Sequence, residues 1–145
     1  MDIKLKSIGS AKNEEKKHFG GWKDVTSELI IDKEYQDALL GLEHYSHLIV
    51  IYFMHEVKTY DLRHVPQGKV GEVPEVGIFA CRCTQRPNPI GITTVELVSI
   101  KDNIVTVKGL DVIGDTPILD IKPYTPQYDS VADAVVPEWV NKLDY

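Results

Sequence analysis

The 145-residue chain has the size of one domain, and its 43% hydrophobic and 26% charged residues are typical of a soluble globular protein. A chain of this length buries enough surface to fold without metal ions or disulfides. Two cysteines and the lack of a signal peptide predict a cytoplasmic protein. The net charge of −6 argues against a protein that holds nucleic acid mainly by its overall charge. The longest apolar run, Leu48 to Met54, is far below the roughly 20 residues of a membrane helix, so we expect no membrane segment.

The first half of the chain predicts strands and one short helix. Strands are indicated by alternating or β-branched apolar residues, and the helix by apolar residues at i, i+3, i+4 and i+7 after a capping aspartate. In chain order we expect a strand over 2–8, a solvated charged stretch over 12–17, a loop at Gly20–Gly21, a strand over 29–31, a helix from Asp32 to Gly41 and a central strand over 47–54.

The second half is also rich in strand and turn signals. In chain order we expect a long loop over 59–75, a strand over 78–84, an irregular turn over 86–91, a hairpin of strands 93–100 and 104–108, short strands at 111–113 and 118–121, and a helix beginning at Pro137. Short strands with frequent turns favour an antiparallel sandwich or barrel. The βαβ rhythm and glycine fingerprint of a Rossmann fold are missing.

Charge and arginine are distributed unevenly. Residues 109–145 hold seven acids and two lysines, whereas residues 1–108 hold 15 acids and 14 bases. A polyanion is therefore expected to dock on the N-terminal three quarters. Of three arginines in the chain, Arg82 and Arg86 lie within five residues of each other, together with both cysteines. This cluster is the first indication of a site.

The two cysteines, Cys81 and Cys83, have no second cysteine or histidine pair at zinc-ligand spacing. On the predicted strand both would share one face with Phe79, while Arg82 would point the other way. Packing is the favoured role, since buried cysteine behaves as a small apolar residue. Redox and metal roles remain open.

Three histidines, His44, His47 and His55, lie around the central strand and are potential metal ligands. His44 and His47 are better explained by structural or hydrogen-bonding roles. His55 follows the strand, where functional groups often gather in loops, and is a candidate pocket residue. We predict no metal site.

The segment from Arg86 to Gly91 is a second candidate. Each arginine offers a planar fork of donors to a carboxylate or phosphate, and Pro87 and Pro89 restrict the backbone around Asn88. A structural turn is the alternative.

These pieces together resemble the TrmO/TsaA-like family of S-adenosylmethionine-dependent tRNA methyltransferases. The run Gly77 to Arg82 followed by Arg86 to Gly91 is similar to the family signature G-x-F-A-x-R…R-P-N-P-I-G. Further similarity lies in Gly41 to Leu48, in His55, and in Leu110 to Tyr124. The resemblance implies one small antiparallel β-barrel domain over residues 1–145, with one or two short helices, acting as a homodimer, and without the C-terminal extension of longer members.

The resemblance also implies methyl transfer to the exocyclic nitrogen of threonylcarbamoyladenosine next to the tRNA anticodon. S-adenosylmethionine would be bound by residues that match the family's: His55, Glu56, Arg82, Ile92, Thr116, Pro117, Ile118, Leu119 and Asp120. Arg82 would clamp the methionyl carboxylate and Asp120 would accept ribose hydroxyls. The candidate catalytic residues are Arg86 and Asn88, with Asn88 bonding the target base; the general base stays unassigned.

The chain departs from the family pattern at several positions. Cys83 replaces a frequent serine, Glu56 a frequent glutamine, and Phe19 to Trp22 a proline-containing cofactor loop. Two other functions therefore stay open: transfer to a small-molecule or protein acceptor, and a non-catalytic cofactor-binding dimer.

Overall fold

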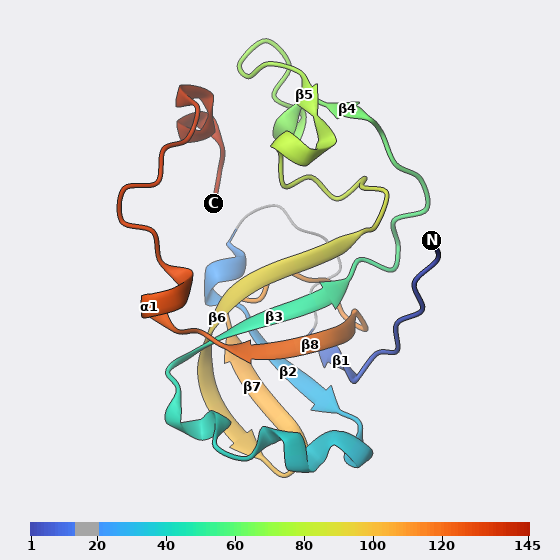
Figure 1. Cartoon of the computed structure of the whole chain (residues 1–145), viewed down its shortest axis with the longest axis vertical. Helices are drawn as coiled ribbons and strands as arrows, with labels where there is room; N and C mark the ends of the chain where they lie inside the picture. Colours follow the sequence, from blue (N-terminus) through green and yellow to red (C-terminus); the bar gives the residue numbers. More distant parts are fainter. Residues whose placement is uncertain (14–20) are drawn as a thin grey trace.

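Six antiparallel strands close into a barrel in the order β1-β2-β7-β6-β3-β8 (Figure 1). The computed structural model describes residues 1–13 and 21–145. The barrel strands are β1 (Gly9–Lys12), β2 (Thr26–Ile31), β3 (His47–Phe53), β6 (Ile90–Lys101), β7 (Ile104–Lys108) and β8 (Pro117–Pro123). A mainly β, non-Rossmann barrel is thus confirmed.

The strands surround one apolar core because alternate side chains of each strand point inward. Its fully buried members include Leu29, Leu48, Val50, Val95, Val105, Val107 and Ile118. A chain reversal at Lys101–Asn103 joins β6 to β7, and Asp102 adopts a left-handed φ of 54° there. This hairpin was predicted from the sequence.

The first strand begins later than the alternation over 2–8 predicts. Residues 1–8 form no strand, and Ile3 and Leu5 remain 76% and 61% exposed. Instead β1 starts at Gly9, whose missing side chain lets it approach the Ile30 carbonyl of β2. The prediction for 2–8 was wrong because apolar alternation does not show whether a partner strand lies alongside.

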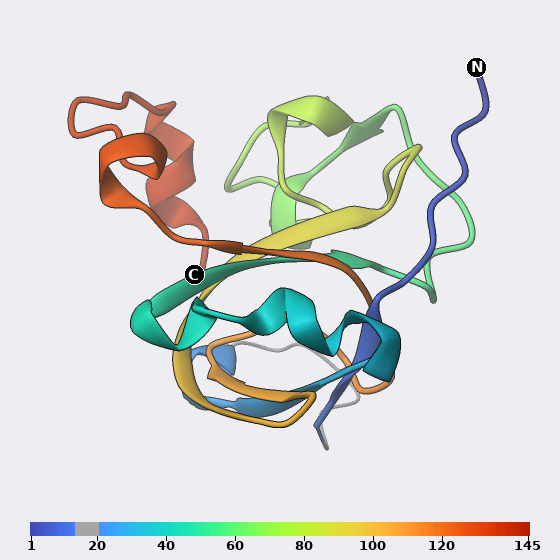
Figure 2. The same cartoon turned by 60° about the horizontal axis from the view of Figure 1, so that its bottom comes forward.

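Helical structure in the described part of the chain is short. One α-helix, α1 (Pro126–Asp129), was not predicted. The expected helix after Asp32 is the 3-10 helix η2 (Lys33–Leu39), without a side-chain cap from Asp32, followed by η3 (Leu42–His44). Both lie across one end of the barrel, which comes forward in Figure 2. No helix of residues 1–13 and 21–145 is long and apolar enough to span a membrane.

The long segment between β3 and β6 rises above the barrel (Figure 1). It holds β4 (Arg63–His64), η4 (Pro66–Gly68), β5 (Val76–Gly77) and η5 (Ile78–Ala80). The strand predicted over 78–84 is wrong: η5 and irregular backbone stand there. Ile78 is 2% exposed and Phe79 82%, so Phe79 does not share a buried face with Cys81.

The C-terminal segment docks on this raised segment. Lys69 Nζ forms an ion pair with Asp144 at 2.9 Å, and Lys142 Nζ donates to the Glu72 carbonyl at 3.2 Å. The 3-10 helix η6 (Glu138–Lys142) begins directly after Pro137, one residue later than predicted. No strand forms over 111–113, where the chain runs irregularly into β8.

Candidate functional site

The end of β3 brings three of the predicted site segments together. Ile51 of β3 faces Ile92 on one side and Asp120 on the other. Beyond β3, the Met54 amide donates to the Pro89 carbonyl at 2.8 Å, which keeps the R-P-N-P turn beside residues 54–56. Residues near 55, 92 and 120, far apart in sequence, therefore meet at this part of the barrel.

Arg82 joins this cluster through β6. Its Nη2 donates to the carbonyl oxygen of Ile92 at 2.9 Å, although the residue itself is exposed. A guanidinium offers five N–H donors in a rigid fork. One donor thus anchors the side chain, and the fork keeps the capacity to bind a carboxylate.

Tyr52 lies behind this arrangement and was not predicted as a site residue. It is 6% exposed, and its hydroxyl bonds the Thr93 hydroxyl at 3.1 Å and the Asp111 carbonyl at 3.2 Å. Burial raises the pKa of the Tyr52 phenol, and Arg82 opposes that shift electrostatically. The only sequence signal for Tyr52 is a polar-tipped aromatic residue in a mostly apolar strand.

His55 follows β3 and carries a buried ring nitrogen. Among the described residues its Nδ1 has no hydrogen-bond partner. A buried polar atom without a partner is uncommon and needs an explanation such as a bound ligand or an ordered water. Glu56, next in the chain, is exposed.

Asp115 and Lys12 form an ion pair at the entrance to β8. Hydrogen bonding and charge from Lys12 hold the pKa of Asp115 below its ordinary value of 3.8, with a smaller effect from His55. Sequence spacing gave no indication of this pair, because 103 residues separate its members.

Most residues from Thr116 to Asp120 are buried or bonded to other parts of the protein. Thr116 is buried, and its hydroxyl donates to the Ile113 carbonyl at 2.8 Å. The side chain of Ile118 lies in the core, so contact with a ligand there is limited to the main chain. Asp120 Oδ1 accepts from the Ile121 amide at 2.9 Å, and Oδ2 pairs with Lys122 at 2.7 Å. Pro117 and Leu119 are half-buried.

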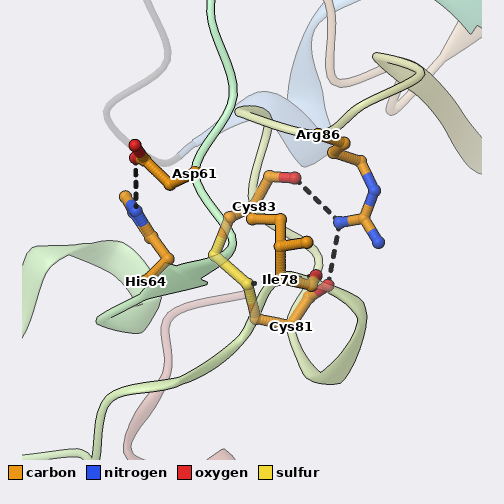
Figure 3. Close-up of a disulfide and its surroundings, with 6 residues drawn as sticks. All are labelled: Asp61, His64, Ile78, Cys81, Cys83 and Arg86. Atoms are coloured by element: carbon orange, nitrogen blue, oxygen red, sulfur yellow. Dashed lines mark hydrogen bonds and ion pairs between the residues drawn. A yellow bond between two sulfur atoms is a disulfide. The ribbon is translucent and has the colours of Figure 1, made fainter.

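Arg86 supports the loop that carries Arg82 (Figure 3). Its Nη1 donates to the carbonyl oxygens of Cys81 and Cys83, both at 2.9 Å. Cys81 and Cys83 are joined by a disulfide, so Arg82 lies between two linked residues. Packing alone therefore does not describe the cysteines. Asn88 is exposed in the turn, and its carbonyl accepts from the Ile90 amide at 2.7 Å.

A cavity of about 460 Å³ lies between the η2–η3 segment and β8. Its walls include Tyr35, Leu39 and Tyr45, and Asp120 is the one predicted site residue among its lining. Arg82, Ile92 and His55 do not line this cavity.

Within residues 1–13 and 21–145, no three or more His, Cys, Asp or Glu side chains are grouped so that they could hold a metal ion. His47 Nδ1 lies 2.8 Å from the Ser46 hydroxyl, and His44 lies 3.6 Å from Glu43. These contacts agree with the structural roles predicted for both histidines.

Comparison with known proteins gives three kinds of match. Residues 8–130 match the family model described as the tRNA-methyltransferase O N-terminal domain. An S-adenosyl-L-methionine-binding protein of Archaeoglobus fulgidus is 40% identical over 112 residues, which cover 77% of this chain and 78% of that protein. The tRNA (adenine(37)-N6)-methyltransferase of Escherichia coli is 39% identical over 119 residues, which cover 77% of this chain and 51% of the enzyme.

A solved structure titled as TrmO superposes with a TM-score of 0.77 at 29% sequence identity. The superposition covers 94% of this chain and 64% of that one. The chain therefore spans less than two thirds of that structure and about half of the E. coli enzyme.

Proposed function

The chain belongs to the family of the tRNA-methyltransferase O N-terminal domain, and from that premise we propose that it is an S-adenosylmethionine-dependent tRNA methyltransferase. Its acceptor is the exocyclic nitrogen of threonylcarbamoyladenosine next to the anticodon. The observation that carries the proposal is local: Arg82 of the family signature is anchored to Ile92 beside the end of β3, where His55 holds a buried Nδ1 that has no partner among the residues the structure describes.

The residues present fit this cofactor. The Arg82 fork suits the methionyl carboxylate, since paired N–H donors match the two oxygens of a carboxylate. His55 Nδ1 is buried and has no hydrogen-bond partner within residues 1–13 and 21–145, and a polar group of a bound molecule would provide one. Asp120 accepts ribose hydroxyls, and its carboxylate orientation is fixed by the Ile121 amide. Glu56, Ile92 and the main chain of 116–119 complete the proposed binding surface.

Positioning is the main contribution that this site makes to catalysis. The cofactor supplies a methyl group on a positively charged sulfur, and the acceptor nitrogen gives up a proton as it gains that methyl. Holding the two reactants in line supplies much of the rate. Asn88 is exposed in the rigid turn and is proposed to hydrogen-bond the acceptor base. Arg86 contributes by fixing the loop under Arg82.

Two measurements on the purified protein test this function. Calorimetry with S-adenosylmethionine should give saturable binding, and incubation with bulk tRNA should then give methylated threonylcarbamoyladenosine in the nucleoside digest by mass spectrometry. The matched control is Arg82→Ala, which should lose most of both signals. Absence of cofactor binding would overturn the proposal, and an unchanged nucleoside profile would remove this acceptor.

A second candidate is a cofactor-binding protein without tRNA methylation. It is favoured by the Archaeoglobus relative, which is named an S-adenosyl-L-methionine-binding protein and is 40% identical over 77% of this chain. Cofactor binding without any methylated tRNA product, also with small-molecule and protein fractions as acceptors, would support it.

A homodimer is part of the proposal. Phe53 and Ile90 face each other across β3 and β6, and Ile92 lies two residues along on the same outer face. All three side chains are exposed and apolar beside the proposed site. Light scattering should give twice the 16.4 kDa chain mass, and Ile90→Asp should shift it towards the monomer.

A further inference from the structure

Tyr52 is a buried phenol directly behind the Arg82 anchor. We propose that Tyr52 is a positioning residue for Arg82: its side chain fixes the Gly91–Thr93 segment, whose Ile92 carbonyl holds the Arg82 guanidinium. This inference rests on the proposed function, since its readout is the binding of S-adenosylmethionine.

The Tyr52 ring and Gly91 fit each other. The two residues are register partners on β3 and β6. The ring occupies the space in which a Cβ atom on residue 91 would stand. Glycine at this position allows the backbone of β6 to lie against the ring, so the ring sets where the strand runs.

The Tyr52 hydroxyl adds two fixed points. It bonds the Thr93 hydroxyl at 3.1 Å and the Asp111 carbonyl at 3.2 Å. Buried polar groups are costly to leave unpaired, so these bonds hold the phenol in one orientation. Gly91 contacts the ring and Thr93 contacts the hydroxyl, which fixes the segment on both sides of Ile92.

The Ile92 carbonyl is the link to Arg82. Arg82 Nη2 donates to it at 2.9 Å. Arg82 is exposed and would otherwise sample many rotamers, and fixing its position in advance lowers the entropy lost on binding a ligand.

The test removes only the hydroxyl. Tyr52→Phe keeps the ring against Gly91, and we expect about three- to tenfold weaker binding of S-adenosylmethionine by calorimetry, as for the loss of a hydrogen bond. In an Arg82→Ala background the same substitution should change affinity by less than about twofold, because energies of coupled residues are not additive. Tyr128→Phe, at an exposed position, is the matched control.

A second ligand separates positioning from general loosening of the site. 5′-Methylthioadenosine lacks the carboxylate, so its affinity should be equal in wild type and Tyr52→Phe. Three results would each overturn the inference. Tyr52→Phe could weaken the binding of both ligands equally, weaken S-adenosylmethionine binding equally in the wild-type and Arg82→Ala backgrounds, or bind S-adenosylmethionine with wild-type affinity. Thr93→Val removes the same bond from the other side and replaces Tyr52→Phe if that variant does not fold. A wild type that binds neither ligand would instead overturn the proposed function.

Discussion

Arg82 and Ile92 are joined by one hydrogen bond of 2.9 Å from the guanidinium to the main-chain carbonyl. This bond fixes an exposed arginine relative to a barrel strand, although ten residues separate the two in sequence. The guanidinium is thereby oriented before any ligand arrives.

Replacing Arg82 by alanine should weaken S-adenosylmethionine binding. A hydrogen bond to a charged group contributes about 1.5–3 kcal/mol, so calorimetry should show a loss of roughly tenfold to a hundredfold. Arg63→Ala is the matched control, because Arg63 is exposed and contacts Glu75 at 3.8 Å. Wild-type affinity in Arg82→Ala would contradict the carboxylate clamp.

Replacing Arg86 by alanine should lower the stability of the fold more than it alters the proposed binding surface around Arg82. Its Nη1 serves two carbonyl oxygens in the same loop. Losing them should reduce the free energy of unfolding by about 1–3 kcal/mol, measured by urea denaturation. A variant as stable as wild type but without methyl transfer would indicate that Arg86 acts in catalysis directly, as its place in the signature predicted.

Adding one methyl group at Gly91 should strain the barrel. The Tyr52 ring stands where the new Cβ would lie, and overpacking typically costs about 1–3 kcal/mol. Thermal unfolding of Gly91→Ala should therefore show a lower midpoint. Gly77→Ala is the control, since a Cβ there meets only the Leu62 carbonyl at 4.0 Å. Equal midpoints for both variants would refute the close fit.

The Lys12–Asp115 pair should be visible in a pH titration. Lys12 lowers the pKa of Asp115, so the contribution of the pair to stability is complete above the ordinary value of 3.8 and is lost as the pH falls through the lower folded pKa. The carboxyl shift of Asp115 by NMR should thus titrate below 3.8 in wild type and at higher pH in Lys12→Gln. Lys6→Gln, which removes an ion pair with Glu34, should leave the Asp115 midpoint unchanged.

The disulfide between Cys81 and Cys83 should protect both sulfur atoms from alkylation. Protein unfolded without reductant should bind no alkylating reagent at Cys81 or Cys83, and two equivalents after reduction. Cys83→Ser should leave one reactive thiol in either case. Because Arg86 still bonds both carbonyl oxygens, the reduced protein should keep its fold by circular dichroism. Two free thiols in the untreated protein would disprove the bond.

Sequence patterns predicted the parts of the fold that depend on residues close together in the chain. The central strand and the 101–103 hairpin were confirmed, since β-branched runs and turn residues act locally. The strand over 78–84 was wrong: a 3-10 helix covers Ile78–Ala80, and Arg86 from the following turn holds the irregular backbone after it through the Cys81 and Cys83 carbonyls.

The candidate site contains residues that the sequence indicated and residues that it did not. Arg82, Ile92 and His55 came from the family resemblance, and the structure brings them to one end of β3. Tyr52 and the Lys12–Asp115 pair depend on which strands adjoin, which no local pattern records. The disulfide was not predicted either, because two cysteines at this spacing fit packing as well as bonding.

The pairing of β1 with β8 sets a condition on the order of folding. Gly9 faces Ile118 across this seam, so the barrel closes only after almost the whole chain is available. Contacts between such distant residues slow folding towards the millisecond-to-second range. During synthesis on the ribosome, the edges of β1 and β3 that β8 covers therefore stay unpaired until β8 emerges, and that interval is when the nascent chain is most exposed to edge-to-edge aggregation.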